Sequence, residues 1–154
     1  MSIFREALTD VAKFTLAITP TNGAAGTSAI NSTSVDMKDY EGVCALVLFG
    51  AITSGAATSF NLAQSADDTT FSDLTGSKQT IADTDDEKAY LSDLIRPTDR
   101  YVRIEVARAT QNAVVSGAFL IQYRSKATTA TLSANQGTAV QDAEQFVSPA
   151  EGTA

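Results

Sequence analysis

The alternation of apolar and polar residues constrains the fold of this chain more than any other feature. Val102, Ile104 and Val106 are separated by single residues, and the same period of two recurs in several short segments. Because successive side chains of a strand point to opposite faces, this period predicts β-strands with one face in a core. Residues typical of turns, mainly Gly, Ser, Thr, Asp and Asn, separate the segments.

We expect about eight antiparallel strands, a number typical of a sandwich or jelly roll. The segments lie at residues 14–19, 30–37, 43–52, 60–63, 79–81, 90–94, 101–106 and 115–123. The predicted fold class is all-β, a jelly-roll-like sandwich. We divide the chain into residues 1–29, an N-terminal arm with the first strand, residues 30–126, the sandwich core that this first strand joins, and residues 127–154, an extended or disordered tail.

Two segments also fit a helix. Phe4, Leu8 and Val11 lie at positions i, i+4 and i+7, which would place them on one helical face. The N-terminal segment is therefore a short helix or an arm that orders on contact. Thr84 and Glu87 have the spacing of a capping box, but we expect a strand at residues 87–94.

The segment 43–52 is apolar on both faces. As a strand it presents two sets of side chains: Val43, Ala45, Val47, Phe49 and Ala51 on one side, and Cys44, Leu46, Leu48 and Ile52 on the other. A strand with one face in water would not be apolar on both sides. We therefore expect the N-terminal segment, a loop or another subunit to cover the second side. Exposed apolar patches usually mark interaction sites, which supports an oligomer.

The composition argues against enzyme chemistry. The 154 residues contain no histidine, the commonest general base and metal ligand. The single cysteine, Cys44, lies in the most apolar segment, which favours a buried structural thiol over a nucleophile. We expect no catalytic residue, no cofactor and no resident metal.

The net charge of −7, from 11 Lys and Arg against 18 Asp and Glu, opposes binding to nucleic acid and to anionic lipid. Two acidic clusters lie in polar segments: Asp67 with Asp68, and Asp83 with Asp85 and Asp86. Solvated turns are the preferred interpretation because Asp favours turns for backbone reasons. A bound cation such as calcium is the alternative.

Certain side chains are candidates for contacts with other proteins. They are apolar residues near the termini and arginines with a neighbouring tyrosine: Phe4, Leu8, Arg96, Arg100, Tyr101, Arg103, Val140, Phe146 and Val147. Arg and Tyr are enriched in protein interfaces. The alternative for Arg103 is a solvated outer face with cross-strand ion pairs. The tail is either disordered or an arm that docks on a neighbour.

Several segments resemble the small proteins encoded among the head genes of tailed bacteriophages, which include capsid decoration (cement) proteins. The segments are residues 36–43 (DMKDYEGV), 60–74 (FNLAQSADDTTFSDL), 100–103 (RYVR) and 121–124 (IQYR), and the resemblance covers residues 30–126. It implies a jelly-roll fold, a dimer or trimer at a capsid symmetry axis, and binding to the major capsid protein.

The expected function is therefore that of a virion structural protein. It would bind the outer surface of a phage capsid and stabilise contacts between major capsid proteins. The alternatives are another phage head or tail protein, or a carbohydrate-binding jelly-roll module. We expect synthesis in the cytoplasm of the bacterial host, no signal peptide, and a final location on the capsid surface.

Overall fold

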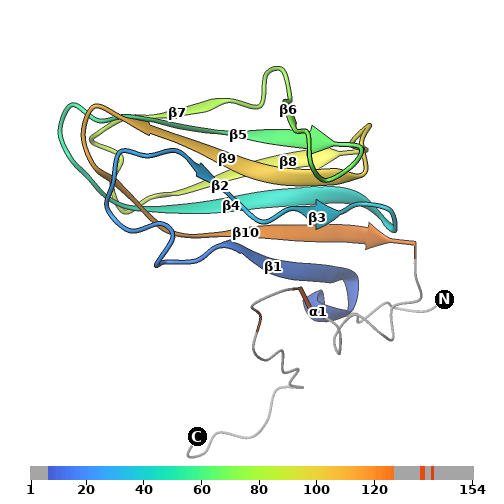
Figure 1. Cartoon of the computed structure of the whole chain (residues 1–154). Helices are drawn as coiled ribbons and strands as arrows, with labels where there is room; N and C mark the ends of the chain where they lie inside the picture. The colour runs from blue at the N-terminus through green and yellow to red at the C-terminus, as the bar shows by residue number, and fades with distance from the viewer. Residues whose placement is uncertain (1–6, 127–135, 138–139, 141–154) are drawn as a thin grey trace, which may run out of the picture.

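The computed structural model describes residues 7–126, 136–137 and 140, which contain ten β-strands and one short helix (Figure 1). In chain order the elements are α1 (Leu8–Val11), β1 (Ala12–Ile18), β2 (Ile30–Asn31), β3 (Val35–Asp36), β4 (Tyr40–Ile52), β5 (Ala57–Ser65), β6 (Ser72–Asp73), β7 (Gln79–Ile81), β8 (Ala89–Ile95), β9 (Tyr101–Ala109) and β10 (Ala113–Ser125).

The strands form two antiparallel sheets. Sheet A has the order β1-β10-β4-β8, and sheet B has the order β2-β9-β5-β6, with β3 also paired to β9 and β7 also paired to β5. Since β2 and β3 share one position, and β6 and β7 share another, the ten strands fill eight positions. The first position pairs with the eighth, the second with the seventh, the third with the sixth and the fourth with the fifth. This is the order of a jelly roll, and the predicted all-β sandwich is confirmed.

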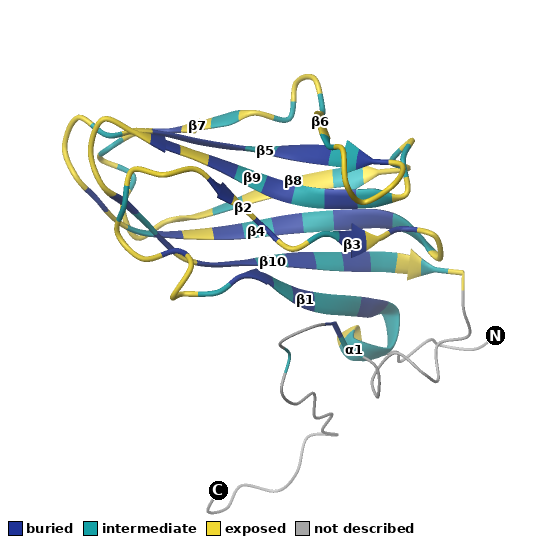
Figure 2. Ribbon diagram, viewed as in Figure 1, coloured by how far each residue is buried: buried dark blue, intermediate teal, exposed yellow. Residues whose placement is uncertain are grey.

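The core lies between the two sheets. Phe49 of sheet A packs 6.3 Å from Phe60 of sheet B, and Tyr90 of sheet A meets both rings edge-on at 5.7 and 6.3 Å. Leu62 and Leu120 are among the fully buried side chains around this cluster. Figure 2 shows the buried residues along β4, β5, β9 and β10, and the exposed ones mainly in the loops. Burial of this apolar surface is the main term that stabilises such a fold.

The two segments with helical spacing differ in outcome. α1 has only four residues and begins at Leu8, where the Ala7 N–H donates to the Asp10 carboxylate at 3.3 Å. Phe4 lies outside the described residues. Residues 89–95 form strand β8, so the predicted strand is confirmed and the capping-box interpretation is wrong. Residues 89–95 form a strand rather than a helix because they pair with β4 along seven residues.

The alternation in β4 reverses near its end, contrary to the sequence prediction. Ile52 is buried and Ala51 is exposed, whereas a regular strand would place Ala51 on the core side with Phe49. The register with β10 shifts there, because Val115 pairs with Phe49 but Ala113 pairs with Ile52. The extra residue on β4 is a β-bulge, which exchanges the two faces of the strand beyond it.

The predicted strand at residues 30–37 is interrupted. β2 and β3 each contain two residues, and Ser32 lies between them. The Ser32 N–H donates to the Ile104 carbonyl at 2.9 Å, while the Ile104 N–H donates to the Ser32 hydroxyl at 2.9 Å. A side-chain oxygen therefore takes the place of a backbone acceptor, which satisfies β9 but ends the regular pairing.

Candidate functional site

The outer face of sheet A is apolar across all four strands. In one row, Leu16 pairs with Phe119, Phe119 with Leu46, and Leu46 with Leu91. Their chain neighbours Ala45 and Leu120 are fully buried on the other side of the sheet, so this row points away from the core. We use the name A face for these outward side chains: Phe14, Leu16, Cys44, Leu46, Leu48, Ala89, Leu91, Asp93, Ile95, Phe119, Ile121 and Tyr123.

The A face has large apolar groups in contact with solvent. Leu91, Ile95 and Leu48 are 62%, 52% and 36% exposed, and none of the three packs against the core. The prediction that Leu46 and Leu48 lie on a second apolar side of β4 is confirmed, and the bulge removes Ile52 from that side. A contiguous apolar surface of this kind is typical of an interaction site.

The A face has one carboxylate among its described side chains, that of Asp93. The Tyr123 hydroxyl donates a hydrogen bond to this carboxylate at 2.6 Å. Burial, followed by this bond and the Asp93 charge, raises the pKa of Tyr123 to about 12. Burial also raises the pKa of the Cys44 thiol, with a smaller contribution from Asp93. Both groups therefore stay neutral at physiological pH, and a thiolate nucleophile is disfavoured. The predicted burial of Cys44 is wrong, because the residue is half-buried and lies on the A face.

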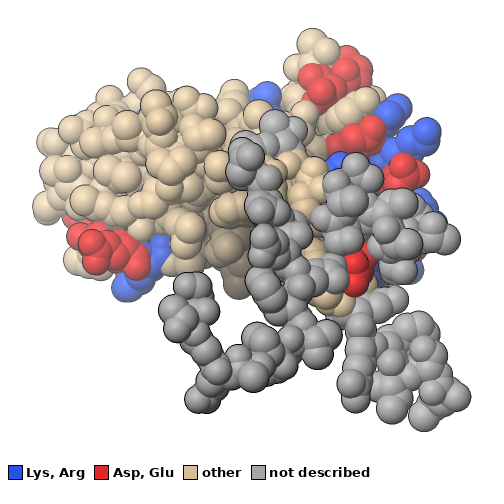
Figure 3. All heavy atoms as spheres, turned by 90° about the horizontal axis from the view of Figure 1, so that it is seen from below, with Lys and Arg blue, Asp and Glu red and all other residues tan. Residues whose placement is uncertain are grey.

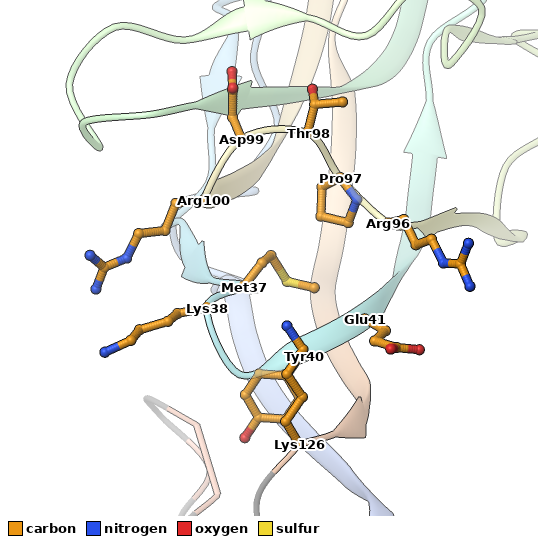
Figure 4. A pocket seen from close by; sticks show the side chains of 10 residues that line it. All are labelled: Met37, Lys38, Tyr40, Glu41, Arg96, Pro97, Thr98, Asp99, Arg100 and Lys126. Carbon is orange, nitrogen blue, oxygen red and sulfur yellow. The ribbon is translucent and has the colours of Figure 1, made fainter.

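A second candidate is a cleft of about 450 Å³ at one end of the sandwich, between residues 37–41 and the loop 96–100 (Figure 4). Four cationic side chains line it: Lys38, Arg96, Arg100 and Lys126. Figure 4 shows Arg96 and Arg100 pointing to opposite sides of Pro97. Two acidic residues, Glu41 and Asp99, also line the cleft, so its charge is mixed.

Arg100 is held in place by its own chain. It donates two hydrogen bonds to the Asp36 carboxylate, at 2.9 and 2.7 Å, and its guanidinium lies 5.1 Å from the centre of the Tyr101 ring. The hydrogen bond from Arg100 lowers the pKa of Asp36 below its usual value. Arg96 is exposed, has a positive φ of 54°, and has no side-chain partner in the described part of the chain. Arg96 is therefore the better placed of the two for an external contact.

Arg103 does not line the cleft that contains Arg96 and Arg100. It lies on the outer face of sheet B, 3.9 Å above the Phe71 ring, and donates to Glu105 at 2.8 Å. Its side chain is 22% exposed. The ion pair with Glu105 joins two residues of β9, so the cross-strand pairing and the solvated face expected as the alternative are not observed. The stacking on Phe71 is a further contact that sequence spacing did not suggest. Charge reversal at Arg103 would therefore perturb the fold as well as any interface.

Arg108 is buried, with no carboxylate partner among the described residues. Its guanidinium donates to the carbonyls of Ser28 at 2.7 Å, Ala24 at 2.7 Å and Ala113 at 2.9 Å. Burial lowers its pKa. Arg108 thus fastens residues 24–28 to the start of β10 and serves the fold.

The tail contacts the edge of β1 where it is described. The Gly137 N–H donates to the Phe14 carbonyl at 2.7 Å, and the Phe14 N–H donates to the Gln136 side-chain carbonyl at 2.8 Å. A Cβ at position 137 would lie 1.9 Å from the Thr15 hydroxyl oxygen, so glycine is required. Sequence reasoning missed this anchor, whose one local signal is a glycine beside a glutamine in a segment of small residues.

The remaining predicted contact residues are not brought together. Leu8 is 64% exposed on α1, and Val140 is half-buried beside Gly137, to which its N–H reaches back at 3.2 Å. Phe146 and Val147 lie outside the described residues. The interface candidates therefore fall into separate groups at the helix, the tail anchor, the cleft and sheet B.

Asp67 and Asp83 accept hydrogen bonds from loops of the chain itself, Asp67 within its own loop and Asp83 from the loop between β4 and β5. Asp67 accepts hydrogen bonds from Ser65, Thr69 and Thr70, which lower its pKa. Asp83 accepts from the Gly55 N–H at 2.7 Å. Within the described ranges, no three Cys, Asp or Glu side chains are grouped closely enough to hold a metal ion.

Comparison with known proteins gives distant likenesses. No protein-family model and no curated protein matches this sequence. Among solved structures, the PBSX exported protein XepA is similar with a TM-score of 0.48 and 14% identity over 99% of this chain. The structure of infectious bursal disease virus, Gt strain, has a TM-score of 0.46 and 9% identity over 73% of this chain. This chain spans 44% and 31% of those chains. These likenesses are too distant to carry an argument about function.

The described residues contain no helix that is both long and apolar enough to cross a membrane. The features that define this protein are its jelly-roll strand order and the A face.

Proposed function

We propose that this chain is a structural protein of a bacteriophage particle that binds the outer surface of the capsid. There it stabilises contacts between major capsid proteins, and it needs no catalytic group or cofactor for this role. The observation that carries the proposal is the A face, an apolar surface that extends over four strands and on which Leu48, Leu91 and Ile95 are exposed. The resemblance of residues 30–126 to phage head proteins supports the same role.

The energetics suit attachment in many copies. Full burial of one exposed leucine or isoleucine side chain contributes about 1.5–3 kcal/mol, and Leu48, Leu91 and Ile95 are available for it. Association costs on the order of 4–15 kcal/mol in lost freedom of motion. A single copy would therefore bind weakly. A protein that binds only the assembled shell stabilises it by mass action, and repeated symmetric sites multiply the effect.

Charge supports contact through the A face rather than elsewhere. The chain has a net charge of −7, but the A face has a single carboxylate, which Tyr123 already binds. Figure 3, which views the molecule from below, shows charged side chains near both ends. A partner with an apolar, weakly charged patch fits this face best, because burying unpaired charges would be costly.

The carbohydrate-binding alternative rests on one further observation. A groove of about 460 Å³ crosses the outer face of sheet B and is lined by polar side chains that include Asn31, Asn61 and Glu105. Its lining contains no aromatic residue on which a sugar ring could stack, and Asn61 already donates to Asp73 at 2.9 Å. Another phage head or tail protein is the second alternative, and copy number per particle separates it from a decoration protein.

The test uses particles from which the protein has been stripped. We expect full-length protein to rebind and to raise the temperature at which the capsids rupture. Bovine serum albumin at the same concentration serves as the control. Rupture at the same temperature with and without rebound protein would contradict a stabilising role. Failure to bind capsids, together with retention on a glycan array, would favour the carbohydrate-binding module.

A further inference from the structure

The two sheets have four edges, and three of them are protected. The edge of β1 is occupied by Gln136 and Gly137. One edge of sheet B is divided between β2 and β3, of two residues each, and the other between β6 and β7, of two and three residues. β8 is the fourth edge, a regular strand of seven residues. Short or covered edges are the usual ways in which proteins prevent strand-to-strand association.

β8 has backbone groups that point away from the sheet. The Arg96 N–H donates to the Glu41 carbonyl at 2.7 Å, and the Phe49 N–H donates to the Lys88 carbonyl at 2.9 Å. Because bonded and non-bonded pairs alternate in an antiparallel ladder, the even-numbered residues of β8 bond to β4. The N–H and C=O groups of Leu91, Asp93 and Ile95 therefore face outward.

The outward edge of β8 has few of the features that discourage pairing. Residues 89–95 contain no proline, no lysine and no register shift against β4. Their one charge is that of Asp93, and no residue of β8 is buried (Figure 2). The Gln79 side-chain amide donates to the Leu91 carbonyl at 2.8 Å. Among the described residues this is the one hydrogen bond to the outward backbone groups of β8. The Gln79 side chain can rotate to another rotamer and leave the Leu91 carbonyl available for pairing.

We propose that β8 pairs antiparallel with β8 of a second copy, which joins two A sheets into one sheet of eight strands. Pairing along the whole strand places the two-fold axis at Ser92. Leu91 then lies opposite the partner's Asp93, and Tyr90 opposite the partner's Leu94. An axis at Asp93 would set two carboxylates against each other and leave part of the strand unpaired.

The proposed register suits a second copy because it sets no two carboxylates of β8 against each other. Two copies with a net charge of −7 repel each other at long range, but in the proposed register neither Asp93 faces a carboxylate. The interface is self-complementary, as a two-fold dimer requires. Salt screens the long-range repulsion and leaves the short-range pairing, so dimerisation should strengthen as ionic strength rises. The joined A faces would form one apolar surface roughly 38 Å wide, from eight strands at about 4.8 Å spacing.

Dimerisation through β8 would take place in solution and does not depend on capsid binding. The first test is the mass of the full-length chain by sedimentation velocity over a range of concentrations. We expect conversion from the 16.1 kDa monomer toward twice that mass, at lower concentration in high salt. A monomer at every concentration and ionic strength would overturn the proposal.

A matched pair of substitutions tests the register. L91D places a carboxylate opposite the partner's Asp93 and should weaken dimerisation tenfold or more, whereas L91K places a cation there and should preserve it. Thr80→Asp, an exposed residue on β7, is the control for added charge. Equal dimerisation of L91D and L91K would contradict the register. Leu91 is exposed, so circular dichroism and melting should show both variants folded.

A cross-link gives a direct readout. In the proposed register the two Ser92 residues form a non-hydrogen-bonded pair, with Cα atoms about 4.5 Å apart, within the range of a disulfide. Ser92→Cys in a Cys44→Ser background should form a covalent dimer under mild oxidation, and the Cys44→Ser background alone should not. Absence of the cross-linked species while the protein dimerises would place the interface elsewhere and overturn the proposal.

Discussion

The outer faces of the two sheets have the same backbone geometry but opposite chemistry. The A face has Leu46, Leu48 and Leu91 side by side and one carboxylate. On sheet B the outward side chains include Asn61, Arg103 and Glu105. Arg103 donates to Glu105 and lies over the Phe71 ring. Asn61 donates to Asp73 of β6. A jelly roll needs only one apolar face on each sheet to form its core. The core therefore does not require the second apolar face of sheet A. This face is the surface that we expect to bind a partner.

The largest expected effect comes from placing a charge on the A face. Leu48→Lys on β4 should reduce affinity for stripped capsids roughly ten- to hundredfold, since burial of one leucine contributes about 1.5–3 kcal/mol. Binding isotherms on purified capsids measure this effect. Thr80→Lys adds the same charge on sheet B and should bind as the wild type does. Equal loss in both variants would mean that total charge, rather than the A face, governs binding.

Charge reversal on sheet B should instead reduce stability. Arg103→Glu removes the cation above the Phe71 ring and sets two carboxylates together with Glu105. We expect the free energy of unfolding to fall by about 1–3 kcal/mol, as measured by urea denaturation. Arg96→Glu is the matched control, because Arg96 is exposed and has no side-chain partner in the described part of the chain. A similar loss in both variants would show that the Phe71 and Glu105 contacts contribute little.

The tail anchor should protect the β1 edge of sheet A, whereas the β8 edge has no such anchor among the described residues. Gly137→Ala introduces a Cβ that would lie 1.9 Å from the Thr15 hydroxyl oxygen, so Gln136 and Gly137 should leave the β1 edge. The Phe14 amide should then exchange its hydrogen faster by tenfold or more in hydrogen–deuterium exchange. Amides of β10, which lie inside the sheet, should not change. An unchanged Phe14 amide would mean that the anchor does not protect this edge.

The contributions of Asp36 and Tyr123 to stability should be lost at opposite extremes of pH. Arg100 lowers the pKa of Asp36 on sheet B in the folded state. Its contribution to stability is therefore present above the unfolded pKa and lost as the pH falls through the folded pKa. The pKa of Tyr123 on the A face is raised to about 12. Its contribution is present below the unfolded value of 10.0 and lost as the pH rises through about 12.

Asp36→Asn and Asp93→Asn separate these contributions. We expect Asp36→Asn to flatten the acid limb of a stability–pH curve, while the alkaline limb stays as in the wild type. Asp93→Asn should lower the pKa of Tyr123, which an ultraviolet titration of the tyrosines measures. The effect of Asp36→Asn is small because the Arg100–Asp36 pair is partly exposed. An Asp93→Asn variant in which every tyrosine titrates as before would contradict the hydrogen bond to Tyr123.

Local patterns in the sequence predicted most of the fold. The period of two located the strands, and the apolar character of both sides of residues 43–52 predicted the A face before any pairing was known. These features depend only on neighbouring residues. The bulge that reverses Ala51 and Ile52 depends on the register with β10, which lies more than 60 residues away in the sequence. No local pattern encodes such a shift.

Long-range contacts account for the remaining differences at the candidate sites. The cluster of arginines was visible in the sequence, but the stacking of Arg103 on Phe71 and the pairing of Arg100 with Asp36 required the packing of distant loops. The anchor of Gln136 on Phe14 joins residues 122 positions apart. The unpaired edge of β8 likewise depends on the order of the strands in sheet A, which local sequence does not encode.

Side-chain footprinting with hydroxyl radicals tests the role of the A face most directly. The protein is labelled free in solution and bound to stripped capsids, and the reactivity of each side chain is compared between the two states. If the A face binds the capsid, Leu46, Leu48 and Phe119 lose reactivity on binding while Phe71 on sheet B retains its own. Protection of Phe71 with unchanged reactivity of Leu48 and Phe119 would contradict the proposal.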